Sequence, residues 1–239
     1  MGLPKLATPI YEIKLHSQDK EIKYRPFLVK EEKLLLMAME SKEEQTMLSA
    51  IKTIINNCLE EGSVVDIDKL PLFDLEYWFL HLRAKSVGED IELNFTCQNE
   101  ECQHQTEYHL NINDVGLQID PNHDPLIKLT DDIYVKMKYP SVKEFSLYGG
   151  QDQATDSIFQ LIAQCMESII QGEEVYETKL QSKKEVDEFI LSLNQTQFKQ
   201  IVEFFNTMPT LRHVINFNCE ACQTQNIHVV QGVENFFLS

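Results

Sequence analysis

The sequence of 239 residues contains no long apolar segment. Its longest unbroken apolar run, LLLMAM at 34–39, is far shorter than the roughly 20 residues that a helix needs to cross a bilayer. The first residues, MGLPKLATPIYEIKL, also lack the apolar core of an export signal. These absences argue against a membrane protein and a membrane partner, and they predict that the protein stays in the cytoplasm in which it is made.

Basic residues are scarce. Lys and Arg total 21 against 38 Asp and Glu, which gives a formal net charge of −17 at pH 7. A surface with this charge repels phosphate groups, so the composition argues against a nucleic-acid partner and favours protein partners. The hydrophobic share of 43% is ordinary for a globular protein and predicts that the chain folds around a core.

Motifs of the common enzyme classes are missing as well. The chain contains no HExxH, GxxxxGKS/T or GxSxG motif, and no GxGxxG that follows a strand. Its acidic side chains are too numerous for the sequence to single out a catalytic pair. We therefore predict that the protein is not an enzyme.

Two parts of the sequence resemble each other at a distance of about 115 residues. The segments EIKLHSQDKEIKYRPFLVKEE and LIKLTDDIYVKMKYPSVKEF each have the pattern of two strands around a polar turn, followed by the start of a helix. The IKL at 13–15 matches the IKL at 127–129, and the VKE at 29–31 matches the VKE at 142–144. Chance matches of such short segments are the alternative to a true repeat.

Helical patterns follow each of these hairpins. In the first half, apolar residues recur at helical spacing over 47–59 and again over 73–82. In the second half, the same spacing predicts one helix over 158–170, which Gly172 ends. It also predicts two helices over 189–205 that break near Asn194.

Each half closes with alternating strand sequence around a pair of cysteines. The first such segment is IELNFTCQNEECQHQTEYHLNI and the second is HVINFNCEACQTQNIHVV. We therefore predict an α+β fold made of an internally duplicated unit, in which a β-hairpin, helices and a Cys-bearing β-hairpin occur twice. The predicted halves are 1–112 and 126–239, and 113–125 is the predicted linker.

The two cysteine pairs have spacings that suit a metal ion. Cys97 and Cys102 are separated by four residues, and Cys219 and Cys222 by two, so that each turn can point two thiolates at one ion. Four thiolates suit the tetrahedral preference of zinc. Without an export signal, metal ligands or thiols are expected rather than disulfides. We predict one structural zinc that these four cysteines share in a zinc-ribbon-like site joining the two halves.

Other roles for these side chains remain open. The paired cysteines can instead be free or redox-active thiols or disulfides, and the ion can be iron. His104 and His109 flank the first pair as alternative ligands, although we expect them at the surface. Cys58 and Cys165 lie on apolar helical stripes, where core packing is expected. Four thiolates leave no coordination position open for water, which favours a structural ion over a catalytic one.

Several long segments resemble a known family. They are LPKLATPIYEIKL, IKYRPFLVKEEKLLLMAMES, KLPLFDLEYWFLHLRAKSVGE, the two cysteine pairs and FKQIVEFFNTMPTLRHVINFNC. Together they resemble the baseplate hub and hub-assembly proteins of T-even-like contractile-tailed bacteriophages, including those of cyanobacteria. The resemblance implies a non-enzymatic structural or assembly component of the tail baseplate hub, with other hub proteins as partners. It also implies assembly in the host cytoplasm and a place in the virion tail baseplate.

Two other functions compete with this one. A zinc-ribbon nucleic-acid-binding or regulatory module is the alternative, but Glu100, Glu101 and Glu220 beside the cysteines would repel phosphates. A metalloenzyme or peptidoglycan hydrolase needs an open metal position or a positioned carboxylate pair, and the sequence singles out neither.

Overall fold

The structure is a computed structural model that describes residues 6–19, 21–41, 43–148 and 155–232. Within these residues the chain forms seven α-helices, three short 3-10 helices and eleven β-strands. The fold is therefore α+β, as the sequence predicts. No helix in the described ranges combines the length and the apolar character that crossing a membrane requires.

The chain packs as two compact units. The first unit comprises Met1–Ile67, Phe73–Gln118 and Thr210–Ser239, and the second comprises Asp68–Leu72 and Ile119–Pro209. This division differs from the predicted halves, because the second Cys-bearing hairpin packs in the same unit as the first. The halves 1–112 and 126–239 describe a repeat along the sequence and stay a prediction.

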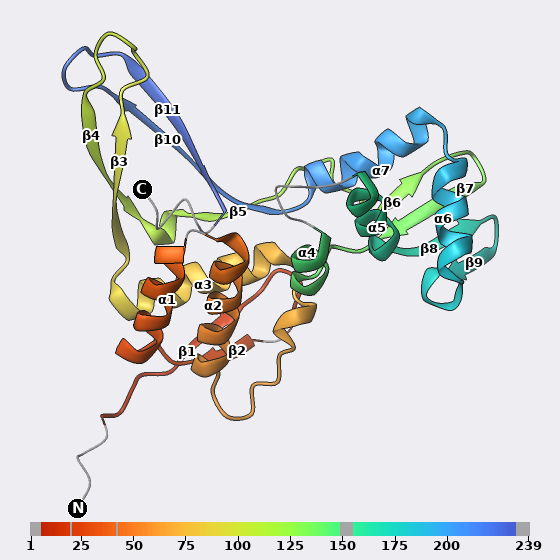
Figure 1. Cartoon of the computed structure of the whole chain (residues 1–239), viewed down its shortest axis with the longest axis horizontal. Helices are drawn as coiled ribbons and strands as arrows, with labels where there is room; N and C mark the ends of the chain where they lie inside the picture. The colour runs from red at the N-terminus through yellow and green to blue at the C-terminus, as the bar shows by residue number, and fades with distance from the viewer. Residues whose placement is uncertain (1–5, 20, 42, 149–154, 233–239) are drawn as a thin grey trace, which may run out of the picture. The chain divides into compact units, whose positions relative to one another are not determined.

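The first unit contains helices and three groups of antiparallel strands (Figure 1). Its elements are β1 (Tyr11–Lys14), β2 (Glu21–Tyr24), α1 (Val29–Ser41), α2 (Glu44–Cys58), α3 (Leu72–Val87), β3 (Asp90–Thr96), β4 (Gln105–Asn111), η2 (Ile112–Asp114), β5 (Gly116–Gln118), β10 (Thr210–Asn218) and β11 (Gln225–Gln231). The strands are ordered β1-β2, β3-β4 and β11-β10-β5. The predicted linker 113–125 therefore contains an ordered strand, since β5 pairs with the start of β10.

The helix α3 is the central element of the first unit. It buries side chains around its whole circumference, which a helix does only when other elements surround it. The buried apolar residues of α3 are Phe73, Leu75, Trp78, Phe79, Leu80, Leu82 and Ala84. Tyr24 of β2 packs edge-on against Trp78, with ring centroids 6.4 Å apart. The buried Asp74 carboxylate accepts hydrogen bonds of 2.9 Å from the backbone N–H groups of His16 and Ser17, which fixes the β1–β2 turn on α3.

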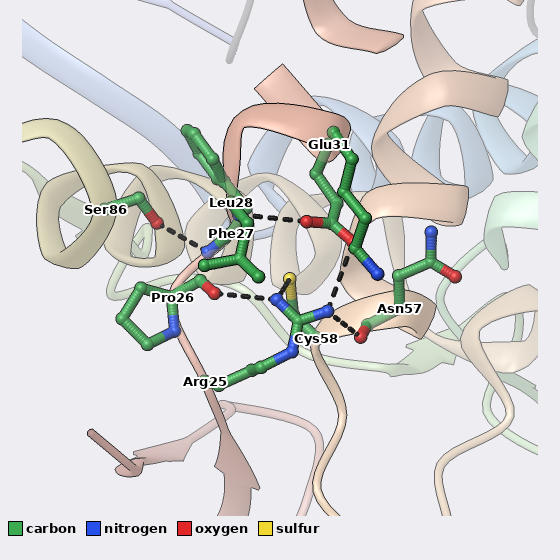
Figure 2. A network of polar contacts seen from close by, with 9 residues as sticks. Arg25, Pro26, Phe27, Leu28, Glu31, Asn57, Cys58 and Ser86 are labelled. Atoms are coloured by element: carbon green, nitrogen blue, oxygen red, sulfur yellow. Dashed lines mark hydrogen bonds and ion pairs between the residues drawn. The ribbon is translucent and has the colours of Figure 1, made fainter. Parts of the chain in front are cut away.

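A buried carboxylate closes the junction of β2, α1 and α2 (Figure 2). Glu31, in the first turn of α1, is fully buried and accepts a hydrogen bond of 2.9 Å from the backbone N–H of Leu28. The Nη2 atom of Arg25 donates to Glu31 at 3.1 Å and to the carbonyl of Asn57 at 2.6 Å. The backbone N–H of Arg25 donates to the carbonyl of Cys58, the last residue of α2, at 2.9 Å. One ion pair thus ties a strand end to the start of one helix and the end of another.

The second unit packs helices against a four-stranded antiparallel sheet (Figure 1). Its elements are β6 (Leu126–Lys128), β7 (Ile133–Met137), α4 (Val142–Tyr148), α5 (Thr155–Cys165), β8 (Met166–Gln171), β9 (Glu174–Glu177), η3 (Thr178–Leu180), α6 (Lys183–Ser192) and α7 (Gln195–Thr207). The short helix η1 (Ile67–Lys69) lies where the chain passes from the first unit to the second. Side chains of the sheet, α5, α6 and α7 form one buried core, which includes Val135, Ile162, Ile190 and Ile201.

The prediction of one helix over 158–170 is wrong in its second part. The helix α5 ends at Cys165, and the next residues form the strand β8, which pairs with β7 on one side and β9 on the other. Ile169 and Ile170 are β-branched and suit a strand as well as a helical stripe. Pairing on both edges of β8 decides between the two, and that pairing involves residues far outside the local pattern.

The second unit repeats the contacts of the carboxylate junction. The side chain of Glu144 accepts a hydrogen bond of 2.7 Å from the backbone N–H of Ser141, at the start of α4. The ammonium group of Lys138 donates to Glu144 at 2.9 Å. The backbone N–H of Lys138 donates at 2.8 Å to the carbonyl of Cys165, the last residue of α5. A cation, a carboxylate and a terminal cysteine are thus arranged as at the first junction.

Replacing Glu31 by Gln is expected to lower the free energy of unfolding by about 1.5–3 kcal/mol at pH 7, the usual contribution of a hydrogen bond to a charged group. Burial by itself raises the pKa of Glu31, but the hydrogen bonds from Leu28, Arg25 and Lys30 outweigh it and hold the pKa below 4.5. The charge therefore stabilises the fold above pH 4.5, and this contribution is lost as the pH falls through the lower folded-state pKa.

Urea unfolding of both proteins between about pH 7 and pH 3 measures this effect. The difference between wild type and Glu31→Gln should shrink on acidification. The exposed neighbour Glu32 supplies the control, since Glu32→Gln should change the free energy of unfolding by less than about 0.5 kcal/mol. A difference that is independent of pH would contradict the assignment.

Candidate metal centre

The candidate site lies at the tips of two β-hairpins of the first unit (Figure 1). The strands β3 and β4 form one hairpin, and β10 and β11 form the other. Each tip carries one predicted pair of cysteines: Cys97 and Cys102 in the first knuckle (97–104), and Cys219 and Cys222 in the second knuckle (219–224). Each knuckle is closed at its base by a backbone hydrogen bond, of 2.8 Å from Cys97 to His104 and 2.9 Å from Cys219 to Thr224.

An aromatic layer holds the hairpins together below the tips. Phe95 of β3 lies 6.1 Å from Phe217 of β10 and 4.4 Å from the His228 ring of β11, measured between ring centroids. Tyr108 of β4 lies 6.0 Å from Phe217. Burial lowers the pKa of His228, which keeps its ring neutral within this layer. The facing hairpin surfaces continue into a buried core that includes Leu93, Leu110, Ile215 and Val230.

This packing brings the four predicted ligands into one cluster. The sulfur atoms of Cys97 and Cys222 are 3.6 Å apart, those of Cys102 and Cys219 are 3.8 Å apart, and all four lie within 4.8 Å of one another. These separations exceed a disulfide bond of about 2.05 Å, and all four cysteines are free. Sulfurs about 2.3 Å from a central zinc form a tetrahedron with edges of about 3.8 Å. The cluster therefore has the size of a tetrahedral four-thiolate site.

The backbone of both knuckles adopts the same unusual conformation. Gln103 has a φ of 48° and Gln223 a φ of 59°, and no other non-glycine residue in the described part of the chain has a positive φ. Each of these residues directly follows the second cysteine of its pair. A left-handed conformation costs such a residue roughly 1–2 kcal/mol, so two matching instances indicate that the turn is shaped by its cysteines.

The backbone N–H groups of Asn99, His104 and Thr224 act to lower the pKa values of Cys97, Cys102 and Cys222, respectively. At Cys97, burial and the neighbouring thiols Cys222 and Cys219 outweigh this effect, so its pKa is raised. The side chain and the backbone of Thr224 together lower the pKa of Cys222 to about 6. Metal binding requires thiolates, so this arrangement of donors suits an ion.

The crowding of the four sulfurs acts against ionisation of the thiols. At Cys102 the hydrogen bond from His104 lowers the pKa, but the neighbouring thiols Cys222 and Cys219, together with burial, outweigh it and raise the pKa to about 11. Several thiolates cannot share so small a space without a positive charge between them. A cation between the four sulfurs would supply that charge.

The other candidates lie outside this cluster. His104 is exposed and contributes its backbone to the knuckle, and His109 is exposed on β4, where it contacts Glu107 at 3.2 Å. Cys58 and Cys165 are fully buried, which confirms core packing, and burial raises their pKa values to about 11 and about 12.

Sequence reasoning missed Asn226 on β11, a fully buried polar residue next to the second knuckle. In the sequence NIHVV, Ile227 and Val229 are about half exposed, at 50% and 48%, while Asn226 and His228 lie on the inward side with the buried Val230. The inward position of Asn226 can be recognised only when it is known which side of β11 faces the other hairpin, because alternate residues of a strand point to opposite sides.

Fold and site define a class of protein: a mixed α+β chain in which two β-hairpins gather four cysteines into a cluster that is able to hold a metal ion. The family model for the T4 bacteriophage base plate protein matches residues 8–238, and the chain belongs to this family. The resemblance noted in the sequence is thus confirmed.

One relative is the "Baseplate hub assembly protein gp26" of Enterobacteria phage T4. The two sequences are 24% identical over 227 residues, which cover 95% of this chain and 97% of the relative. No solved structure is significantly similar to the chain.

Replacing Gln103 by Gly is expected to raise the free energy of unfolding by up to about 1 kcal/mol, because glycine adopts the left-handed conformation without steric cost. The control is Gln105→Gly on β4, where the strand pairs with Thr96. A glycine there should destabilise the protein by roughly 0.5–1 kcal/mol. Chemical denaturation of the two variants measures both values, and destabilisation by Gln103→Gly would contradict the assigned backbone conformation.

Proposed function

We propose that the chain is a non-enzymatic structural or assembly component of a bacteriophage tail baseplate hub. Membership of the base plate family over 8–238 is the observation that carries this proposal. The name of the T4 relative, a hub assembly protein that matches this chain almost end to end, supports the hub as its place of action. Other hub proteins are its partners, with assembly in the host cytoplasm and a site of action in the tail baseplate.

We propose further that Cys97, Cys102, Cys219 and Cys222 hold one structural zinc. The sulfur separations of 3.6 and 3.8 Å and the matching left-handed turns support this ligand set. Four protein ligands leave no position for a substrate or water, which makes the ion structural. Tetrahedral thiolate sites also suit iron, and metal analysis separates the two.

The zinc would fasten the tips of two hairpins whose lower parts are already packed together. The ligands in each hairpin lie 117 and 125 residues from their partners in the other, so the ion closes a long loop of chain. Exposed Glu100, Glu101 and Glu220 surround the tips and argue against a nucleic-acid-binding ribbon. A protein partner fits this surface better.

We also propose that the chain is an internally duplicated unit whose copies meet at this zinc-ribbon-like site. The order β1-β2, α1, α2, α3 and β3-β4 is followed by β6-β7, α4, α5, α6, α7 and β10-β11. A hairpin, helices and a Cys-bearing hairpin thus occur twice, and β8-β9 is an addition to the second copy. The boundaries 1–112 and 126–239 describe these copies.

Matching contacts at the two carboxylate junctions support the duplication. In both junctions a basic residue precedes a helix, and a carboxylate in the first turn of that helix binds both the basic side chain and a backbone N–H. The next helix ends in a buried cysteine, and the carbonyl of this cysteine accepts a hydrogen bond from the backbone N–H of the basic residue. The equivalent positions are Arg25 and Lys138, Glu31 and Glu144, and Cys58 and Cys165. A shared origin explains three matched contacts more simply than chance.

The purified protein is expected to contain about one zinc per chain by elemental mass spectrometry. Cys97→Ser and Cys222→Ser should lower this content and speed hydrogen exchange in β10 and β11, because the tips lose their cross-link. Glu220→Gln, in the second knuckle but not a ligand, should keep both values unchanged. A metal-free wild-type protein, with the four clustered thiols reactive before any chelation, would remove the zinc from the proposal.

The hub role is tested in the phage that encodes the chain. Without the gene, electron microscopy of lysates should show no complete baseplates, because a component of the hub or of its assembly is missing. The wild-type gene supplied in trans should restore them, and Cys97→Ser should restore fewer. Normal baseplates in the absence of the protein would refute the hub role whatever the metal content.

A further inference from the structure

A fully buried amide lies between the two knuckles. Asn226 of β11 has no exposed surface, in a position that faces the other hairpin. A buried amide destabilises a fold unless its donors and acceptor are all bonded. The partners of Asn226 therefore indicate what the residue does.

Asn226 bonds both knuckles at once. Its Oδ1 atom accepts a hydrogen bond of 2.7 Å from the backbone N–H of Gln98, which directly follows Cys97. Its Nδ2 atom donates at 2.8 Å to the carbonyl of Thr224, which lies in the second knuckle. One side chain thus links the backbone beside a ligand in the first knuckle to the backbone of the second.

Gln98 returns the contact to β11. Its Nε2 atom donates to the carbonyl of Ile227 at 2.9 Å, and its Oε1 atom accepts from the N–H of Ile227 at 3.2 Å. The Gln98 amide therefore pairs with the free edge of β11 as a peptide group of a neighbouring strand would. Residues 226 and 227 together hold Gln98 at three points.

The contact with Gln98 places the Asn226 amide next to a proposed metal ligand, because Gln98 directly follows Cys97. The Asn226 amide is thus bonded to the backbone of both knuckles. Polar groups in this outer position set the orientation of metal ligands and the affinity for the ion.

We propose that Asn226 is a positioning residue of the metal centre, which fixes the backbone beside Cys97 in the first knuckle on the backbone of the second knuckle. The four sulfurs then keep the spacing that one tetrahedral ion needs. This inference rests on the proposed zinc site.

The first hairpin supplies a matched control. Thr106 lies four residues after Cys102, as Asn226 lies four residues after Cys222. The hydroxyl oxygen of Thr106 is buried and has no hydrogen-bond partner in the described part of the chain. Thr106→Val therefore removes a polar group at the equivalent position without breaking a bond, and it keeps the volume of the side chain.

The test compares wild type, Asn226→Asp and Thr106→Val in the full chain. Asp keeps the acceptor for Gln98 but loses the donor to Thr224 and adds a negative charge beside the four cysteines. Competition with a chromogenic chelator should give a zinc dissociation constant tenfold to a hundredfold weaker for Asn226→Asp and unchanged within twofold for Thr106→Val. The visible bands of the Co(II)-substituted protein should change in Asn226→Asp alone, a readout that a general loss of stability does not move.

Circular dichroism establishes that each variant is folded. If Asn226→Asp does not fold, Asn226→Leu, which is similar in size and uncharged, takes its place with the same expectation. Zinc affinity and Co(II) bands like those of wild type in the folded variant would overturn the role of Asn226 and leave the zinc site standing. A wild-type protein that binds no zinc would overturn both.

Discussion

The packing of β10–β11 against β3–β4 is the contact on which the candidate metal centre depends. It joins segments 117 and 125 residues apart at the tips, and chain entropy opposes such a contact. The aromatic layer of Phe95, Tyr108, Phe217 and His228, with the apolar core below it, offsets that cost by removing apolar surface from water. The sulfurs meet because the two hairpins pack against each other beneath them. The knuckles are therefore positioned by packing, and an ion would complete a site whose parts already face each other.

The polar contacts around the tips follow the same logic. Asn226 and Gln98 bond across the hairpins, so that the buried Asn226 amide has partners in both knuckles and the free edge of β11 is covered where the knuckles meet. At the two carboxylate junctions, the carboxylates of Glu31 and Glu144 each help to connect the end of a strand, the start of one helix and the end of another. Such local contacts suit the proposed role of the chain as a non-enzymatic structural or assembly component.

Sequence patterns predicted much of the secondary structure because the signals were local. The break between α6 and α7 falls at Asn194, whose side chain caps α7 by accepting from Gln197. The Ser141 and Glu144 pair likewise caps α4. The spacing of apolar residues gave a wrong prediction where it suited both a helix and a strand. Met166–Gln171 continues the helical spacing of α5, but pairing with β7 and β9 makes it a strand. The spacing also gave no warning that Asn226 faces inward while Ile227 faces out.

The sequence by itself determined the α+β class, the two cysteine pairs and the family, because each is carried by composition, by short spacings or by long matching segments. Only the tertiary structure decided that both Cys-bearing hairpins belong to one compact unit and that their four sulfurs lie within 4.8 Å of one another. A spacing such as CxxC fixes which thiols share a turn. The meeting of two turns depends on how much apolar surface is buried between strands that are more than a hundred residues apart in sequence. A local sequence pattern carries no information about that buried area.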